Sequence, residues 1–244
     1  MKYIMLGLYP FIGTTIGASF VFILKRQINK KIERIILGLS SGVMLSASFF
    51  SLLLPSIELS TNLGKLQFLP SCFGLALGIF LFVLIDKIIY KYQKNYFLMP
   101  VVVTLHNIPE GMAVGVAIAS ILLRNNLMTY TSVLALSIGI AIQNIPEGAI
   151  ISMTLKSKGR SKFKSFLIGV LSGVVEPISS LVTIIFTNII STILPYTLAL
   201  SAGAMIYVII EELIPNAYQE NSKGLIVSFT IGFILMMILD VMLG

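Results

Sequence analysis

FLMPVVVTLHNIPEGMAVGVAIASI, residues 97–121, is an apolar stretch long enough to cross a lipid bilayer as a helix, yet it carries a carboxylate near its middle. The pentapeptide Asn-Ile-Pro-Glu-Gly at its centre occurs again at residues 144–148, inside the apolar stretch 129–154. A carboxylate at a helix centre in hydrocarbon costs roughly 2.5 to 3.5 kcal/mol on insertion scales. Two such carboxylates need a physical reason, and a bound metal ion is the simplest one.

The composition is that of a multi-spanning membrane protein. Hydrophobic residues make up 57% of the 244 residues, charged residues only 11%, and the mean hydropathy is +0.98. These values exclude a soluble globular domain and a disordered chain. Because the apolar stretches lack the alternating polar face of a barrel strand, they predict helices. We expect an all-α membrane protein, one polytopic transmembrane domain over residues 1–244, with eight transmembrane helices near 3–24, 35–57, 68–89, 97–121, 129–154, 166–190, 193–214 and 225–243.

The basic residues predict the orientation. Of the 17 Lys and Arg residues, 14 fall in alternate connections between the expected helices. Such connections face the cytoplasm, so both termini are expected outside. The net charge of +7 is then explained by topology and by anionic lipid head groups, and nucleic acid is not expected as a partner.

The N-terminus and the cysteine count add two further expectations. Only Lys2 precedes the first apolar stretch, and no small-residue cleavage site follows it, so we expect a retained helix rather than a signal peptide. Cys72 is the only cysteine, which excludes a disulfide framework and a thiolate metal cluster.

Five of the ten acidic residues lie inside the expected helices, namely Glu110, Glu147, Glu176, Glu211 and Glu212. No Lys or Arg occurs at residues 95–123, 125–155 or 165–222, so salt bridges within these helices cannot neutralise the carboxylates. Protonation, hydrogen bonding or a bound cation remains. The spacing of the neighbouring polar residues favours a bound cation.

The two motif copies place ligand side chains on one helix face. His106 and Glu110 are four residues apart, as are Gln143 and Glu147, so each pair lies a single helical turn apart. The proline of each motif removes one backbone donor, which frees a carbonyl four residues earlier and should kink the helix. The glycine after each glutamate lets a neighbouring helix approach closely.

Two kinked helices that face each other would gather several metal ligands at one place, with a third carboxylate from the Glu176-Pro177 pair. Imidazole with carboxylate oxygens suits zinc and other borderline divalent ions, and the absence of thiolate argues against copper(I). A purely structural role is the alternative, because Asn and Gln also hydrogen-bond between membrane helices. The candidate ligands are His106, Asn107, Glu110, Gln143, Asn144, Glu147 and Glu176.

Four other polar residues carry weaker signals. Glu211 and Glu212 precede Pro215 near the inner end of an expected helix, where they form either an accessory metal site or a solvated helix end. Ser51 and Glu58 are seven residues apart on one helix face and could line an outer entrance, although an acid that ends a helix is the equal alternative.

With these residues, the chain resembles the ZIP family of divalent metal transporters, in its bacterial GufA-like branch. The resemblance spans essentially the whole chain and is carried by His106-Asn107-Ile108-Pro109-Glu110-Gly111 and Gln143-Asn144-Ile145-Pro146-Glu147-Gly148. Residues 46–58, Glu176-Pro177, and residues 201–205 leading to Glu211-Glu212 fit the same pattern.

The resemblance implies a 3+2+3 arrangement, in which the first three and the last three helices are related by an inverted pseudo-twofold axis. It also implies a binuclear metal centre, with Glu110 and Glu147 bridging two ions. One ion would be held by His106, Glu110, Gln143 and Glu147, and the other by Asn107, Glu110, Asn144, Glu147 and Glu176. In the same pattern Ser51 and Glu58 match entrance positions, Glu211 and Glu212 match an inner accessory site, and Met205 belongs to the pathway.

The chain departs from the family pattern in three places. Many members have histidine where this chain has Gln143, and often aspartate at Asn144, so this centre has fewer nitrogen and charged ligands. We therefore expect two ions to bind unequally. Residues 87–95 contain no histidine, so a histidine-rich sensor loop is not expected.

The resemblance leads us to expect a secondary transporter, not an enzyme, that imports divalent metal ions into the cytoplasm by elevator-like alternating access. Zn²⁺ is the expected main substrate, and Fe²⁺, Mn²⁺ and Cd²⁺ are expected to be transported with less selectivity. The metal is a substrate rather than a cofactor. The expected location is a bacterial inner membrane, and the chain could form a homodimer. The alternatives are a passive metal channel and an intramembrane metalloenzyme. The enzyme is disfavoured because the chain has a single histidine and no His-Glu-x-x-His motif.

Overall fold

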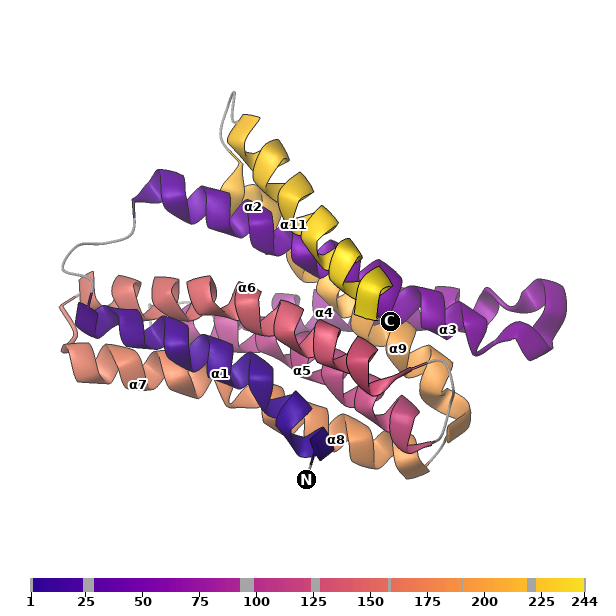
Figure 1. Cartoon of the computed structure of the whole chain (residues 1–244). Coiled ribbons are helices and arrows are strands. Elements are labelled where there is room, and N and C mark those ends of the chain that lie inside the picture. The colour runs from indigo at the N-terminus through magenta and orange to yellow at the C-terminus, as the bar shows by residue number, and fades with distance from the viewer. Residues whose placement is uncertain are drawn as a thin grey trace.

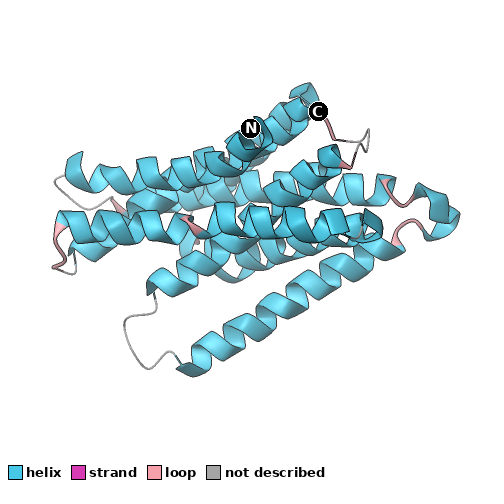
Figure 2. Ribbon diagram, turned by 90° about the horizontal axis from the view of Figure 1, so that it is seen from below, coloured by secondary structure: helices cyan, strands magenta, loops and turns pink. Residues whose placement is uncertain are grey.

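The computed structural model describes residues 2–23, 29–92, 99–123, 128–157, 159–189, 191–218 and 223–243. Within these ranges every regular element is a helix (Figure 2). The helices are α1 (Lys2–Ile23), α2 (Lys30–Ala47), α3 (Leu54–Glu58), α4 (Leu69–Tyr92), α5 (Met99–Leu122), α6 (Tyr130–Ser157), α7 (Lys162–Gly173), α8 (Val175–Ile189), α9 (Leu194–Val208), α10 (Ile214–Ala217) and α11 (Lys223–Leu243). Shorter turns are η1 (Ser48–Leu53), η2 (Thr61–Leu66), η3 (Ser191–Ile193) and η4 (Ile209–Leu213).

Among the described residues, 7 helical runs are long and apolar enough to cross a membrane. The remaining run, α5, is an apolar helix of 24 residues, Met99–Leu122. The all-helical membrane class predicted from composition is therefore confirmed. The number of eight spans stays a prediction.

Two helical runs begin earlier than hydropathy predicts, because polar residues cap them. The run expected at 35–57 begins at Lys30, where the Asn29 side chain accepts a hydrogen bond from the backbone N–H of Lys31. The run expected at 166–190 begins at Lys162, capped in the same way by Ser161. Several basic residues predicted for the connections therefore lie on the first helical turns instead.

The helices pack in two bundles. In the first bundle, defined as α1, α5, α6, α7 and α8, α1 packs along α6 and α5 packs along α8. In the second, defined as α2, α3, α4, α9, α10 and α11 with η1 and η4, α2 packs along α11 and α4 packs along α9. Figure 1 shows α1, α6 and α7 side by side, with α2 and α11 together above them.

Within each bundle, glycines bring helix backbones into direct contact. A Cβ atom on Gly17 of α1 would overlap the carbonyl oxygen of Ile145 on α6. In the second bundle, Gly42 of α2 lies in the same way against the carbonyl oxygen of Phe229 on α11. Small residues at helix contacts are the usual means of close packing in membranes, because no water-driven force holds the helices together.

The contact between the bundles is different. One hydrophobic cluster joins them, with Met44 from α2, Val114 from α5, Leu136 from α6 and Met205 from α9. Among the described glycines, Gly139 of α6 alone faces the opposite bundle, and it meets the flexible thioether of Met236 rather than backbone. Side chains, not interlocked backbones, therefore separate the two bundles.

Two π-helical turns interrupt the second bundle. In η1 the N–H that follows the turn, on Leu54, bonds to the carbonyl of Phe49, and in η4 that of Ile214 bonds to Ile209. Each turn is followed by a proline at the second residue of the next helix. Proline lacks the amide that an α-helical carbonyl four residues earlier needs, and a wider turn adjusts the backbone around this defect.

The glycine contact of α1 with α6 gives a stability prediction. Gly17→Ala should lower the free energy of unfolding by about 1 to 3 kcal/mol, because the new methyl group overlaps the Ile145 carbonyl and forces the helices apart. The measurement is the apparent melting temperature of the purified protein in detergent. Gly224→Ala is the matched control, since a Cβ there meets nothing within 4 Å. Equal melting temperatures for the two variants would contradict this packing.

Candidate metal centre

Five of the seven ligands predicted from the sequence meet in the interior of the first bundle. Asn107 and Glu110 come from α5, Gln143 and Asn144 from α6, and Glu176 from α8. Each of these side chains is at most 2% exposed. They therefore form one buried polar site between three helices.

A break between α7 and α8 brings Glu176 into this site. Pro177 cannot donate a backbone hydrogen bond, and the helix is interrupted at Val174, so Glu176 lies in the first turn of α8. The free amide groups of a helix N-terminus favour a carboxylate there. On the facing helix, Gly111 directly contacts the Glu176 carbonyl oxygen, which lets α5 approach this turn closely.

The same break provides a partner for Asn107. The last carbonyl groups of a helix lack intrahelical donors, and the carbonyl of Ser172 at the end of α7 accepts a 2.9 Å hydrogen bond from Asn107 Nδ2. This contact fixes the carboxamide of Asn107 and directs its nitrogen toward α7. The carboxamide oxygen is left for another partner.

The carboxylates take hydrogen bonds on one oxygen each. Gln143 Nε2 donates to Glu110 Oε1 at 2.8 Å, and Asn144 Nδ2 donates to Glu176 Oε1 at 3.0 Å. Thr14 of α1 also donates to Glu176 Oε1, at 2.8 Å. Every available donor nitrogen of these carboxamides is thus directed at an oxygen of a carboxylate or of the backbone.

Five oxygen atoms of the site have no hydrogen-bond partner among the described residues: Asn107 Oδ1, Glu110 Oε2, Gln143 Oε1, Asn144 Oδ1 and Glu176 Oε2. An unsatisfied buried acceptor costs about 1 to 3 kcal/mol, and more when it is charged. Oxygen acceptors with two carboxylates and no nearby basic side chain are the donor set of a divalent cation. Bound cations would give these oxygens the partners that the described residues do not supply.

The two remaining predicted ligands are Glu147 and His106. Glu147 is half-buried on α6 and lies within electrostatic range of Glu110 and of Glu212 across the bundle contact. His106 belongs to α5, but its side chain falls outside the described residues. In the described part of the chain, no three His, Cys, Asp or Glu side chains are close enough to hold one ion alone. A metal ion here would therefore also need carboxamide oxygens or His106.

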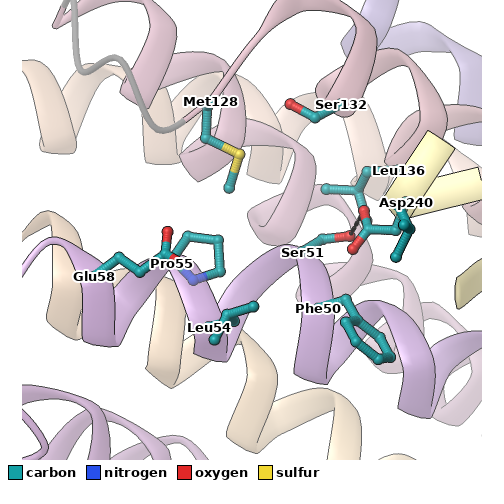
Figure 3. A pocket seen from close by; sticks show the side chains of 10 residues that line it. Phe50, Ser51, Leu54, Pro55, Glu58, Met128, Ser132, Leu136 and Asp240 are labelled. Carbon is teal, nitrogen blue, oxygen red and sulfur yellow. Dashed lines mark hydrogen bonds between the residues drawn. The ribbon is translucent and has the colours of Figure 1, made fainter. Parts of the chain in front are cut away.

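Ser51 and Glu58 line a cavity of about 200 Å³ at the contact of η1 and α3 with α6 and α11. Ser51 Oγ donates to Asp240 Oδ1 of α11 at 2.7 Å, and Figure 3 shows Glu58 at the far end of the cavity beyond Pro55. Both residues thus line one cavity, as their spacing predicts. Asp240, which the sequence showed only as an acid near the chain end, is a further member.

Glu211 and Glu212 lie on the π turn η4, the first exposed and the second half-buried. Nearby Tyr207 hydrogen-bonds to Asp86 of α4 and lies within electrostatic range of both glutamates. Met205, predicted as a pathway residue, is fully buried in the hydrophobic cluster between the bundles. None of the three predicted residues, Glu211, Glu212 and Met205, is among the residues that meet in the buried site.

Thr14 was missed from the sequence. It lies four residues after Pro10 and beside Gly13 in a stretch that shows only small and apolar residues. The pattern Gly13 to Gly17 signals close helix packing, but it gives no sign of a hydroxyl directed at a carboxylate. Only the three-dimensional arrangement reveals this contact.

Comparison with known proteins decides the family. The model of the ZIP zinc transporter family matches residues 91–240, more than half of the chain, including both motif copies. The chain belongs to the ZIP zinc transporter family. This ZIP protein is 31% identical to the zinc transporter ZIP11 of Xenopus tropicalis, over 95% of the chain and 94% of the relative. It is also 31% identical to the zinc transporter GufA of Myxococcus xanthus, over 95% of both chains.

A third relative of this ZIP protein is the zinc transporter ZIPB of Bordetella bronchiseptica, 31% identical over 98% of the chain and 80% of the relative. The resemblance inferred from the two motifs is therefore confirmed. Membership of a transporter family also confirms that the chain is not an enzyme, which removes the metalloenzyme alternative.

The unpartnered oxygens of this ZIP protein predict metal-induced stabilisation. At a free Zn²⁺ concentration of 100 times the dissociation constant, binding at one site should raise the free energy of unfolding by about 2.7 kcal/mol. Glu110→Gln should abolish most of this gain, because it removes one buried charge of the site. Without metal, the same variant should be at least as stable as the natural protein, since a buried carboxylate is costly.

Thermal unfolding of the purified protein, with chelator and with Zn²⁺, tests this prediction. Glu33→Gln, in the first turn of α2, is the control and should keep the full metal-induced shift. A Glu110→Gln variant that is destabilised without metal but keeps the shift would assign Glu110 to structure rather than to metal binding.

Proposed function

We propose that the chain is a secondary transporter that imports Zn²⁺ into the cytoplasm through the site between α5, α6 and α8. The observation that supports this most is a group of five buried oxygens without a partner among the described residues, on Asn107, Glu110, Gln143, Asn144 and Glu176. Relatives named zinc transporters cover nearly the whole chain, which supports Zn²⁺ as the main substrate. Fe²⁺, Mn²⁺ and Cd²⁺ are further substrates, transported with less selectivity.

The proposed centre holds two ions bridged by Glu110 and Glu147. His106 and Gln143 complete one position, and Asn107, Asn144 and Glu176 complete the other, as in the family pattern. The electrostatic influence of Glu176 on Glu110, and of Glu110 on Glu147, supports a shared site, because a cation bound among these carboxylates would reduce their mutual repulsion. The position with His106 should bind more tightly, since it holds the only imidazole in the chain.

Movement of the first bundle against the second would expose this centre to each side of the membrane in turn. The packing supports this, because glycines interlock backbones within each bundle while apolar side chains fill the contact between bundles. The interlocked contacts would keep each bundle rigid, and the side-chain contact would permit sliding. This is an elevator-like form of alternating access.

The packing pairs also support the inverted 3+2+3 arrangement of eight spans. Exchange of the first three spans with the last three, and of α5 with α6, converts the pair α1 with α6 into α8 with α5, and α2 with α11 into α9 with α4. The π turns η1 and η4 occupy matching places in the second and seventh spans. We propose this domain over residues 1–244 in a bacterial inner membrane, with both termini outside, as a monomer or homodimer.

Metal flux through the proposed centre can be tested directly. Proteoliposomes with the natural chain should take up Zn²⁺, and the double variant Glu110→Ala, Glu147→Ala should fall to the background of empty liposomes, because both bridging carboxylates are lost. Glu33→Ala is the control variant and should retain normal uptake. Undiminished Zn²⁺ uptake by the double variant would contradict the assignment of the metal centre to these residues.

The alternative of a passive channel predicts that bundle movement is unnecessary. In a Cys72→Ser background, Gly139→Cys with Met236→Cys should form a disulfide between the bundles, and Gly38→Cys with Ser228→Cys a matched one inside the second bundle, since each pair is in contact. Oxidation of the first pair should reduce Zn²⁺ uptake to near background, reversibly with a thiol reductant. Oxidation of the second pair should leave uptake unchanged.

Uptake that persists with the cross-link between Gly139→Cys and Met236→Cys in place would contradict bundle movement. Initial rates should also saturate with Zn²⁺ for a carrier. Rates that rise steadily with metal concentration, together with insensitivity to the cross-link, would favour the channel.

A further inference from the structure

Among the described residues, Thr14 of α1 is the one side chain outside α5, α6 and α8 that hydrogen-bonds to a candidate ligand; α7 contributes only the backbone carbonyl of Ser172. The Thr14 side chain is 1% exposed, and its Oγ1 donates to Glu176 Oε1 at 2.8 Å. The ordinary acceptor for a helical threonine, the carbonyl one turn earlier on Pro10, lies farther away at 3.4 Å. The hydroxyl is therefore directed at the carboxylate.

The two carboxylate oxygens of Glu176 have different surroundings. Oε1 accepts hydrogen bonds from both Thr14 and Asn144, whereas Oε2 is buried with no partner among the described residues. A carboxylate whose one oxygen holds two donors offers only its other oxygen to a cation. Both oxygens could coordinate only if at least one of the two hydrogen bonds were given up.

The packing around Thr14 holds its side chain in place. Gly173 at the end of α7 lies directly against the Thr14 side chain, and Gly148 of α6 lies against its backbone carbonyl oxygen. Gly148 follows the second motif glutamate as Gly111 follows the first, and Gly111 lies against the carbonyl of Glu176 in the same way. Thr14 thus has the same relation to α6 that Glu176 has to α5.

We propose that Thr14 is a positioning and specificity residue of the metal centre, which keeps Glu176 a ligand through one oxygen and thereby favours Zn²⁺ over larger divalent ions. The inference rests on the proposed metal-transport function. Zn²⁺ is commonly four-coordinate and takes carboxylate oxygens singly, whereas larger cations with more ligands accept both oxygens of one carboxylate. Without the Thr14 hydrogen bond, Glu176 is freer to rotate and offer both oxygens.

The test compares Thr14→Val, which keeps the shape but removes the hydroxyl, with Thr14→Ser, which keeps the hydroxyl. In proteoliposomes, Thr14→Val should raise the KM for Zn²⁺ and lower the preference for Zn²⁺ over Cd²⁺, each by about tenfold, the effect of losing one hydrogen bond to a charged group. The maximal rate should change less than about twofold, because bundle movement is untouched. Thr14→Ser should restore both values.

Thr183→Val is the matched control, since Thr183 is a buried threonine of the same bundle whose hydroxyl bonds only to the backbone of Ser179 among the described residues. It should leave KM and metal preference unchanged. Unchanged metal preference in Thr14→Val would overturn the proposal. An equal loss of maximal rate in Thr14→Val and Thr14→Ser, at constant preference, would reduce Thr14 to a packing residue and overturn it as well.

A second readout separates this inference from the transport proposal. Zn²⁺ and Cd²⁺ dissociation constants, measured by calorimetry on the purified protein, should show the same tenfold change of preference in Thr14→Val. If the natural chain transports no zinc, the proposed function fails, but the ratio of dissociation constants still decides the role of Thr14. A ratio equal to that of the natural chain overturns it.

Discussion

The carboxylates of Glu110 and Glu176 are buried in the first bundle, each with one oxygen that has no partner among the described residues, and no Lys or Arg occurs at residues 95–123, 125–155 or 165–222. The surrounding structure follows from this constraint. Gln143 and Asn144 direct their nitrogens to the carboxylates, so their own oxygens remain as additional acceptors. The break before α8 and the glycine contacts bring three helices close enough for these groups to meet. Ionised carboxylates at this place need a proton or a cation to balance their charge.

All described groups of the buried site belong to the first bundle, whereas the cavity with Ser51, Glu58 and Asp240 is lined largely by the second. A site carried by one bundle and a cavity lined largely by the other fit the alternating access proposed above. Glu147, on α6 of the first bundle, also lies within electrostatic range of Glu212 on the second bundle. The repulsion between these two carboxylates therefore depends on how the two bundles are aligned.

Much of this arrangement could be predicted from the sequence. Hydropathy identified the helical runs, and the spacing of Asn107, Glu110, Gln143 and Asn144 indicated one shared site, because both motif copies repeat at the same depth of an apolar helix. Helix starts were missed where Asn29 and Ser161 provide caps, since hydropathy averages over such single residues. Thr14 and Asp240 could not be assigned, because their contacts join residues far apart in the chain. Nor does periodicity reveal a π turn, which needs only one residue more than an α-helical turn.

The π turns η1 and η4 set the angular register of everything beyond them. An α-helix advances about 100° per residue, so one extra residue in a turn rotates the following segment by roughly that angle relative to the preceding one. In the second bundle this rotation separates the part of α2 that packs on α11 from the segment that carries Glu58, and the part of α9 that packs on α4 from α10. Each of these long spans therefore presents one face to its packing partner and a different face to the cavity or the solvent. A single-residue deletion in either turn would shorten the protein by almost nothing, yet it would rotate the segment beyond the turn away from its present neighbours.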